Sequence, residues 1–393
     1  MTDSKRNDQA MNDTSSKEKI NIFIACHKPS YVPDNPLLCP VQVGAELTDE
    51  RLKGMQPDNE GDNISAKNPY YCELTAQYWA WKHADCDYYG FFHYRRYLAF
   101  DKVCKVQADG SIDGKRITPY IELNNVWDDL SCHKIDEESM RELIRDYDIL
   151  TVYRERINTS VYEQYCRYHN RACLDKAIEI LKARHPEFST AADRYMSSHE
   201  VYYMNMYIMR KDIFSEYMSW LFDILEEYER CAGMYLSSEA ATDTVNVSGC
   251  ELPKADIDAE LELKADVNVS ADKAAAGIKD TDSKTAPDSQ QGRDDGHGLI
   301  EPRIMGFLAE RLFGIYYTYK LSRGAKCGEL RYIKFYNTDP DAKTSNTELR
   351  SFSVGPLKLK IDMRKLNRLF PAGSRRRMLI RGLIITKNKE TDV

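Results

Sequence analysis

The segment DYYGFFHYRRYL, residues 87–98, decides the fold that we expect for this chain of 393 residues. Its run from Tyr88 to Phe92 is apolar without a break, which is typical of a strand buried on both faces of a sheet. The run ends at HYRR, residues 93–96, where charged side chains follow at once. In open α/β sheets, ligands bind outside the carboxyl ends of the strands. The segment therefore predicts a central strand with a basic ligand site at its end.

Further segments of strand character alternate with helical ones. Residues 20–26 (INIFIAC) and 147–152 (YDILTV) are short apolar runs, and residues 73–82 and 137–145 carry apolar side chains at helical spacing. Strands that alternate with helices predict an α/β fold, with a Rossmann-like sheet flanked by helices. We also expect a short strand near 40–43, a strand over 201–209, helices over 162–184 and 211–231, and a C-terminal helical part beginning with the long apolar helix 303–321.

Composition separates the two ends and one insertion from the folded domain. Residues 1–18 are mostly polar, and residues 236–298 contain 14 acidic residues against 6 Lys or Arg, with no Phe, Trp or Tyr. Segments with so little apolar content cannot bury a core, so both are predicted to be disordered. The folded domain is then expected over 19–235 and 299–345, followed by a basic amphipathic segment over 346–393.

Bulk composition excludes several classes of protein. The hydrophobic content of 42% suffices for a core, and the net charge of -7 gives no support to nucleic-acid binding. The 11 cysteines include no Cys-x-x-Cys pair, so we expect reduced thiols. The sequence contains no secretory leader and no apolar run of about 18 residues, which predicts a cytoplasmic protein.

Polar residues follow each of the three expected strands. They are His27 and Lys28 after the first, residues 93–96 after the second, and residues 153–156 (YRER) after the third. Two adjacent guanidiniums, Arg95 and Arg96, can hold a diphosphate, because each offers a planar and permanently charged fork to phosphate oxygens. The residues alone equally allow a structural ion pair at one arginine and a solvated side chain at the other.

Asp85 and Asp87 form an Asp-x-Asp pair, a pattern that can hold a divalent cation on a diphosphate. The pair precedes its strand, so we expect it at the amino end of the sheet, opposite the ligand side. A solvated turn is therefore the favoured interpretation. No metal ligand is assigned, and a manganese or magnesium site is the less favoured alternative.

Four polar residues in apolar surroundings are further candidates. Glu200 stands just before the run 201–209 and could act as a base or as a helix cap. Asn205 lies inside that run, where an amide needs a specific partner. Glu310 and Arg311 interrupt the apolar helix; they form a structural ion pair, or Glu310 is the general base that deprotonates an acceptor hydroxyl.

The last part of the chain is strongly basic. Residues 357–389 carry 11 Lys or Arg and a single acid among Leu, Ile, Phe and Met. Such a segment suits anionic lipid headgroups, so we expect peripheral attachment to the inner face of the plasma membrane. Nucleic acid is the alternative partner, and the near absence of aromatic side chains for base stacking disfavours it.

Six segments, taken in order, resemble a family of bacterial capsular and exopolysaccharide biosynthesis proteins. This family has long been catalogued as a domain of unknown function and is regarded as glycosyltransferase-like. The segments are IFIACHK (22–28), PVQVGAE (40–46), GDNISAKNPYYCELTAQYWAWK (61–82), DYYGFFHYRRYL (87–98), MNMYIMRKDIF (204–214) and RIMGFLAERL (303–312). Residues 236–298 are an insertion relative to the family pattern.

The resemblance implies a GT-A-like domain that takes a UDP-linked or other nucleotide sugar. Such a domain would transfer a galactofuranosyl or another hexosyl residue to a cell-surface polysaccharide or a lipid-linked glycan. In most GT-A enzymes an Asp-x-Asp motif follows the strand that residues 88–92 form here. Because residues 93–96 stand in that place, we expect Arg95 and Arg96, with His93, to neutralise the leaving diphosphate instead of a metal ion.

The same hypothesis assigns the remaining roles. Binding of the donor is expected from His27, Lys28, Lys67, Asn68, Tyr94 and Tyr97. Binding of the acceptor is expected from Asn205, Arg311 and Glu200, with Glu310 as catalytic base. A base implies inversion at the sugar carbon, whereas a retaining transfer needs none.

Two other classes of function compete with this one. A non-catalytic scaffold that holds polysaccharide enzymes at the membrane predicts no affinity for nucleotide sugars. A sugar-nucleotide hydrolase or phosphotransferase ranks last, because the sequence has no phosphate loop of the GxxxxGK type.

Overall fold

The structure is a computed structural model that describes residues 17–113, 116–234, 299–341, 349–354 and 357–362. Its strands are β1 (Ile20–Cys26), β2 (Leu38–Gln42), β3 (Gln56–Pro57), β4 (Tyr88–His93), β5 (Arg96–Val106), β6 (Tyr120–Asn125), β7 (Ile149–Val152), β8 (Glu155–Arg156), β9 (Glu200–Val201), β10 (Tyr207–Arg210), β11 (Cys327–Asn337), β12 (Leu349–Val354) and β13 (Leu357–Asp362). Its α-helices are α1 (Asn68–Tyr71), α2 (Leu74–His83), α3 (Glu137–Arg145), α4 (Val161–Tyr168), α5 (Arg171–Arg184), α6 (Ser189–Met196), α7 (Lys211–Ala232) and α9 (Ile304–Ser322).

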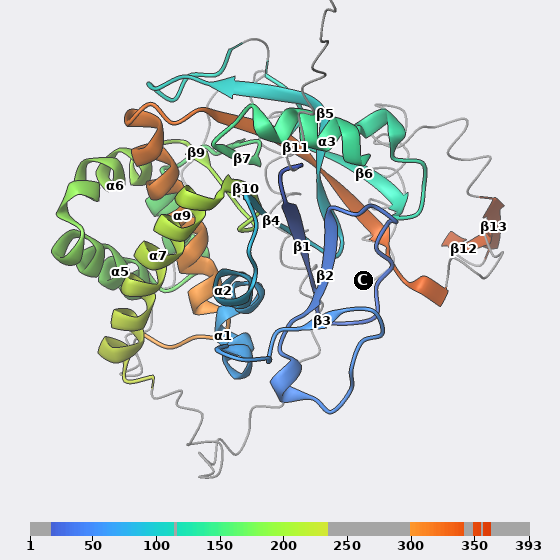
Figure 1. The fold of residues 1–393 in the computed structure, drawn as a ribbon, viewed down its shortest axis with the longest axis horizontal. Helices are drawn as coiled ribbons and strands as arrows, with labels where there is room; N and C mark the ends of the chain where they lie inside the picture. The colour runs from blue at the N-terminus through green and yellow to red at the C-terminus, as the bar shows by residue number, and fades with distance from the viewer. Residues whose placement is uncertain (1–16, 114–115, 235–298, 342–348, 355–356, 363–393) are drawn as a thin grey trace, which may run out of the picture.

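The main sheet is mixed, and β1 lies in it between β2 and β4 (Figure 1). β1 pairs in parallel with β2 on one side and with β4 on the other. β10 is antiparallel to both β4 and β7, and it lies between them. β1, β4 and β7 therefore run in the same direction, and their carboxyl ends share one edge of the sheet. This confirms the expected α/β class.

β11 is a long strand that connects the two edges of the sheet. It starts at the amino edge, where Cys327 lies opposite Ile149 of β7. It ends near the carboxyl edge, where Lys334 lies opposite Arg96 of β5. Its first half is parallel to β7, and its second half is parallel to β6. β11 thus carries side chains from the core to the ligand edge.

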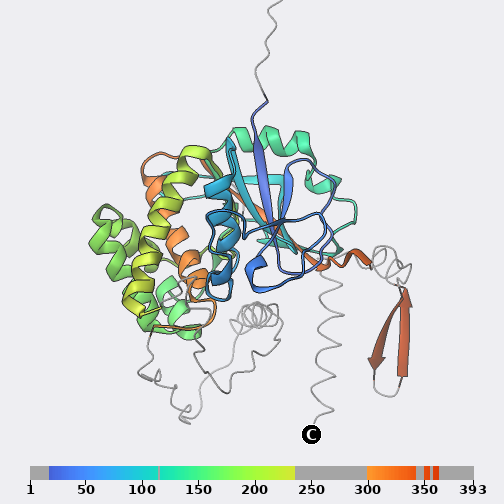
Figure 2. The ribbon, with the colours of Figure 1, turned by 60° about the horizontal axis from the view of Figure 1, so that its bottom comes forward.

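Helices α5, α6, α7 and α9 gather on one side of the sheet, and α3 lies beside β5, away from them (Figures 1 and 2). Aromatic contacts join these layers. Phe91 of β4 lies 5.3 Å from Phe214 of α7, measured between ring centroids. Phe313 of α9 stacks on Tyr207 of β10 at 5.4 Å. Aromatic pairs of this kind contribute about 1 kcal/mol each beyond the burial of their area, so they anchor the helices to the sheet.

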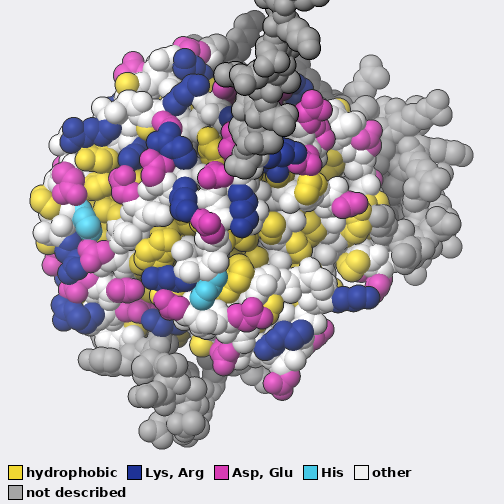
Figure 3. Space-filling view, viewed as in Figure 1, with side chains coloured by type: hydrophobic (Ala, Val, Ile, Leu, Met, Phe, Trp, Pro, Cys, Tyr) yellow, Lys and Arg dark blue, Asp and Glu magenta, His cyan; other side chains and the backbone are white. Residues whose placement is uncertain are grey.

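The surface over the helices mixes acidic and basic side chains, as the face seen in Figure 3 shows. Two of the ion pairs join helices: Lys182 with Asp193 at 2.6 Å and Lys320 with Glu216 at 3.0 Å. Exposed pairs of this kind typically contribute about 0 to 1 kcal/mol each. The aromatic core therefore contributes more to holding the layers together than the charged surface does.

Gly90, in the middle of β4, has a packing reason. A Cβ atom there would lie 2.8 Å from Cγ1 of Ile22 and 3.0 Å from Cγ1 of Ile208. The side chains of both neighbouring strands close over this position, which leaves room for hydrogen alone. The glycine in GFFHYRR therefore allows β4 to sit tightly between β1 and β10.

Most of the expected elements appear within one or two residues of their predicted bounds. Residues 20–26 and 137–145 form β1 and α3 with the expected limits, and α7 and α9 occupy the predicted helical segments. Residues 162–184 are two helices, because Asn170 interrupts the pattern and its side chain accepts a hydrogen bond from the amide of Ala172 at the start of α5.

The segment 201–209 differs from the expected continuous strand. β9 ends at Val201 and β10 begins at Tyr207. Between them, Met204 and Asn205 have φ angles of 78° and 47°, in the left-handed region that breaks a strand. The apolar side chains there are buried although the backbone forms a turn and not a strand. Hydrophobicity alone does not distinguish these two cases.

β11 was not among the expected strands. Its sequence, CGELRYIKFYN, is interrupted by charged residues that obscure the apolar pattern. Glu329 and Arg331 are nevertheless paired, with Arg154 and Asp101 respectively. Pairing across the sheet allows a strand with charged positions to be central, so the C-terminal part contains strands besides the helix α9.

Several predictions concern residues that the structure does not describe. The acidic insertion predicted over 236–298 lies outside the described residues, as does most of the predicted tail over 1–18 and of the basic segment over 346–393. Within the last segment, the backbones of β12 and β13 pair as an antiparallel hairpin. Among the described helices, none is both long enough and apolar enough to span a membrane.

Candidate functional site

The carboxyl ends of β1 and β4 bring two basic segments side by side. The two strands pair in register as far as Ala25 and His93. The amide of Tyr94 continues this ladder and donates to the carbonyl of Ala25 at 3.1 Å. Residues 27–28 and 94–96 therefore leave the sheet next to each other.

Tyr94 is the centre of this basic cluster. Its buried ring meets the edge of the His27 ring at 4.9 Å between centroids. Lys28 Nζ and Arg95 Cζ each lie 5.4 Å from the centroid of the same ring. Part of the His27 ring is open to solvent, but desolvation and the charges of Lys28 and Arg95 lower its pKa to about 4. His27 is therefore neutral at pH 7, and the cations are Lys28 and Arg95.

Arg96 adds a third positive charge beneath this surface. Its side chain is buried, with 5% of the residue exposed. Burial lowers the pKa of Arg96, and the charge of Arg95 acts in the same sense, whereas Tyr332 opposes it. A desolvated guanidinium beside other cations is electrostatically costly, and an anionic ligand would offset that cost.

His93 and Asn205 tie the basic cluster to the turn between β9 and β10. Nε2 of His93 donates to the carbonyl of Met204 at 2.7 Å, since a carbonyl only accepts. Nδ2 of Asn205 donates to Glu73 at 2.8 Å and to the carbonyl of Gly306 at 3.1 Å. These bonds satisfy the NH2 group of Asn205, whose need for a partner the sequence had indicated, whereas its buried Oδ1 accepts no hydrogen bond from the described residues. They also join β4, α9 and the turn into one unit.

Glu310 and Arg311 lie on the other side of the same turn. Glu310 accepts a hydrogen bond from the amide of Met204 at 2.8 Å and pairs with Nη1 of Arg311 at 3.2 Å. Arg311 is almost fully buried, with 2% exposed, and its Nη2 donates to Gln164 at 2.8 Å. The structural ion pair that the sequence allowed is therefore present. Glu310 remains half-buried, within reach of the site.

Glu155, just beyond the end of β7, is a second carboxyl group in this region. Its side chain is half-buried, and its charge also acts on Tyr203 and Tyr332. Burial raises the pKa of Glu155 to about 7, and the negative charge of Glu310 contributes to the rise. Among the described residues, no side chain donates a hydrogen bond to the Glu155 carboxyl group or pairs with it.

Arg154 and Glu200 form a separate, compensated network. Arg154 Nε lies 2.9 Å from Oε1 of Glu329, which is fully buried, and Tyr202 donates to the same oxygen at 2.6 Å. Arg154 also pairs with Glu200 at 2.8 Å, and Arg116 pairs with Glu200 at 2.9 Å. Glu200, which the sequence placed with the acceptor, is thus engaged by two guanidiniums in the wall of a different cavity.

Three other expected donor ligands have structural contacts. Lys67 Nζ pairs with Glu229 at 2.9 Å. Asn68 donates from its side chain to the carbonyl of Cys72 at 2.9 Å. Tyr97 is fully buried in the core. The structure does not bring these side chains to the basic cluster around Tyr94, and we leave them out of the site.

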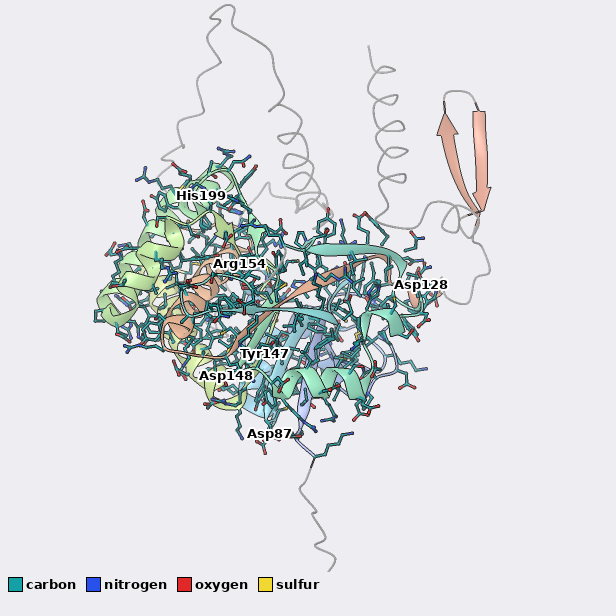
Figure 4. All side chains as sticks on the ribbon, turned by 90° about the horizontal axis from the view of Figure 1, so that it is seen from above. Asp87, Asp128, Tyr147, Asp148, Arg154 and His199 are labelled. Atoms are coloured by element: carbon teal, nitrogen blue, oxygen red, sulfur yellow. The ribbon has the colours of Figure 1, made fainter. Side chains whose placement is uncertain are left out.

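The Asp-x-Asp pair lies at the opposite end of the sheet. Figure 4 shows Asp87 and Asp148, which precede β4 and β7, at one end, and Arg154 toward the other. Asp87 accepts a hydrogen bond from the amide of Lys19 at 2.7 Å, and Asp85 pairs with Lys211 at 2.6 Å. The pair therefore does not fit a cation at the ligand edge. Among the described residues, no cluster of three His, Cys, Asp or Glu side chains is arranged to hold a metal.

Three residues of the site escaped sequence reasoning. Glu73 lies just before α2 and partners Asn205, yet it looked like an ordinary surface position of an amphipathic helix. Glu155 stood in a segment after an expected strand, but only topology brings it to Glu310. Arg303 precedes α9, and its charge acts on both His93 and Glu73. In the sequence these residues share one feature that could have identified them: each lies next to the end of an apolar helix or strand.

Comparison with known proteins identifies the family. A solved structure titled as the apo form of WbbM, a bifunctional glycosyltransferase, is similar with a TM-score of 0.56 and 26% sequence identity. The match covers 81% of this chain and 46% of that chain, so this protein corresponds to less than half of WbbM. The search of curated proteins gave no match. The family described as a domain of unknown function, DUF4422, matches residues 21–243, and the chain belongs to this family.

Proposed function

We propose that the protein is a glycosyltransferase that moves a hexosyl residue, galactofuranosyl or another, from a nucleotide sugar to a growing cell-surface polysaccharide or lipid-linked glycan. The observation that carries the proposal is the group of cations around Tyr94 at the carboxyl ends of β1 and β4. Its location is where open α/β sheets bind nucleotides. The similarity to a bifunctional glycosyltransferase supports the same class of reaction.

The cations would bind the diphosphate of the donor. Lys28 and Arg95 both lie close to the ring of Tyr94. The guanidinium of Arg96, the next residue in the chain, is buried and desolvated. When the bond from the sugar to the phosphate breaks, negative charge develops on the diphosphate. Preorganised cations in a poorly solvated site stabilise that charge most effectively. Arg95 and Arg96 would thus do the work that a divalent cation does in many related enzymes.

Neutral His27 and the ring of Tyr94 add apolar surface to the same cluster. Their edge-to-face contact at 4.9 Å leaves an uncharged region beside the cations. A nucleotide offers both a polyanion and a flat base, so it matches cations next to aromatic rings. We take the nucleotide to be uridine diphosphate, with the sugar directed toward His93 and the turn at residues 204–205.

The acceptor would approach from the side of Asn205, Glu310 and Arg311. Glu310 and Asn205 hold the turn at residues 204–205, and His93 at the end of β4 donates to the carbonyl of Met204 in that turn. We further propose that the basic segment 357–389 holds the protein on an anionic membrane, near a lipid-linked acceptor. Flotation with vesicles containing phosphatidylglycerol, for the full chain and for a chain ending at residue 356, tests this attachment.

A binding screen followed by a transfer assay tests the central proposal. Thermal unfolding would be measured with UDP-, GDP- and CMP-sugars, since a ligand that binds the folded state alone raises the melting temperature. We expect a UDP-sugar to raise it, and the shift to shrink in Arg95→Gln. Arg171→Gln is the matched control, because Arg171 is exposed on α5, far from β1 and β4 in the chain, and pairs with its neighbour Asp175.

The outcomes separate the proposal from its competitors. A shift with nucleotide sugars together with release of nucleoside diphosphate in the presence of a glycan acceptor supports a transferase. No shift with any nucleotide sugar favours the membrane scaffold instead. Activity that disappears with EDTA and returns only with manganese would contradict the role given to Arg95 and Arg96.

A further inference from the structure

The two carboxyl groups at the acceptor side of the site differ in how they are held. Glu310 accepts the amide of Met204 at 2.8 Å and pairs with Arg311 at 3.2 Å. Among the described residues, none donates a hydrogen bond to the Glu155 carboxyl group, and no cation pairs with it. One carboxylate is therefore fixed by the protein, and the other is left for a proton or a ligand.

The backbone directs Glu155 toward the site. β8 follows the carboxyl end of β7, where successive side chains of an extended chain point to opposite sides. Arg154 points into the buried network with Glu329 and Glu200. The next side chain, Glu155, therefore points the other way, where its charge interacts with Glu310.

The pairing of β8 with β9 sets Glu155 opposite Val201, three residues before Met204, whose amide Glu310 accepts. Glu310 from α9, Tyr203 from the turn before β10 and Tyr332 from β11 interact electrostatically with Glu155, and the charge of Arg96 also acts on Tyr332. Neither Glu310 nor the two tyrosines carry a positive charge, and Arg311, which faces the Tyr203 ring at 5.3 Å, pairs with Glu310. Glu155 is thus desolvated, faces one negative charge and lacks a compensating cation. Such surroundings favour the protonated form of a carboxyl group.

We propose that Glu155 is the general base of the transfer and that Glu310 is a positioning residue; this inference rests on the proposed function. In the step, Glu155 takes the proton of the acceptor hydroxyl as the oxygen of that hydroxyl forms a bond to the anomeric carbon. The bond from that carbon to the donor phosphate breaks, and its electron pair leaves with the nucleoside diphosphate. The sugar configuration is inverted, and Glu155 ends protonated.

The arrangement explains why both carboxyl groups are present. A general base works best when its pKa lies near the working pH, because it is then ionised yet still basic. Burial and Glu310 together raise the pKa of Glu155 to about 7. Glu310, fixed by Met204 and Arg311, supplies a constant negative charge to its neighbour and also holds the turn that carries Asn205.

The test compares Glu155→Gln with Glu310→Gln across pH. For the wild-type enzyme with its donor and acceptor, kcat/KM should rise with pH and level off above an inflection near pH 7. Glu155→Gln should lower kcat/KM by about 100-fold or more and remove the inflection, with donor affinity unchanged. Glu310→Gln should keep substantial activity, because a Gln oxygen still accepts the Met204 amide, and should move the inflection to lower pH.

Glu216→Gln is the matched control, since Glu216 is an exposed carboxylate on α7 that pairs with Lys320. Activity retained in Glu155→Gln but lost in Glu310→Gln, with donor still bound, would overturn the inference and leave the transferase proposal standing. A wild-type protein that binds no nucleotide sugar would overturn both. A retained configuration at the transferred sugar would also overturn the role of Glu155 as base.

Discussion

The two ends of the sheet treat charge in opposite ways. At the amino end, Asp85 pairs with Lys211, and Asp148 pairs with Arg210. At the carboxyl end, charges of the same sign lie together: Lys28, Arg95 and Arg96 around Tyr94, and Glu155 beside Glu310. The first arrangement lowers the energy of the folded chain by itself. The second places like charges close to one another, an arrangement that a ligand of opposite charge would stabilise.

This difference indicates which end of the sheet would be stabilised by binding a ligand. Groups that repel one another in the free protein persist only because packing holds them, and functional sites are where such cost is tolerated. The amino end also contains charged residues, yet its ion pairs need no ligand. The presence of charged residues therefore does not identify the site. The site is identified by charged side chains that have neighbours of the same sign.

The largest expected effect comes from the buried network around Arg154 at the carboxyl end. Arg154→Met removes the cation beside Glu329, which is fully buried. Breaking a buried pair from one side costs about 3–5 kcal/mol, because an uncompensated charge remains. We expect the free energy of unfolding, measured in urea, to fall by that amount.

The control for this change removes both charges. In Arg154→Met combined with Glu329→Gln, no carboxylate is left without its guanidinium, and Tyr202 can still donate to the Gln oxygen. Most of the lost stability should return. A double variant as unstable as the single one would mean that packing of Arg154, rather than its charge, holds β7 to β11.

The sequence predicted the location of the site better than its members. The apolar run ending in residues 93–96 was sufficient, because strand direction and the carboxyl-end rule follow from hydrophobicity and chain order. Asn205 was recognised from the cost of burying an amide. Both predictions depend on residues that are close together in the chain, so they can be made without knowing the fold.

Other members depend on contacts between distant segments. Glu155 interacts with Glu310 only because β7 and α9 are brought together. Tyr94 lies in the turn between β4 and β5, beside His27, whereas Tyr97 lies within β5 and is fully buried in the core. The left-handed turn at Met204 was equally invisible, since it contains no glycine.

The second prediction tests the clustered cations directly. Arg95→Gln should lower kcat/KM for sugar transfer by about 100-fold, as expected when one preorganised stabiliser of developing charge is lost. Stability should be unchanged or slightly higher, because repulsion with Arg96 is relieved. Steady-state kinetics and urea unfolding of the same preparation measure both. A loss of stability with normal kinetics would make Arg95 structural.

The third prediction concerns Glu155 and pH. Its pKa is raised from an ordinary 4.5 to about 7, so the folded protein holds this proton more tightly than the unfolded chain. The associated stability is complete below pH 4.5 and is lost as pH rises through 7. Glu155→Gln imitates the protonated form. It should match the wild type below pH 4.5 and exceed it by up to about 3 kcal/mol at pH 8.

His27 gives a smaller effect of opposite sign. Its pKa is lowered from an ordinary 6.5 to about 4, so the unfolded chain takes up a proton that the folded protein does not. The associated stability is present above pH 6.5 and is lost as pH falls toward 4. Urea unfolding at pH 7 and pH 5 should show a smaller loss for His27→Gln than for the wild type. Equal losses would place the titration elsewhere.

The smallest effect is expected at the amino end and completes the comparison. Lys211→Gln breaks the pair with Asp85, whose side chain is 85% exposed. Both partners remain solvated, so the free energy of unfolding should hardly change, and sugar transfer should be unaffected. A transfer rate as low as that of Arg95→Gln would mean that the amino end takes part in the reaction. Since Lys211 begins the long helix α7, the same result would point to this helix as the connection between the two ends.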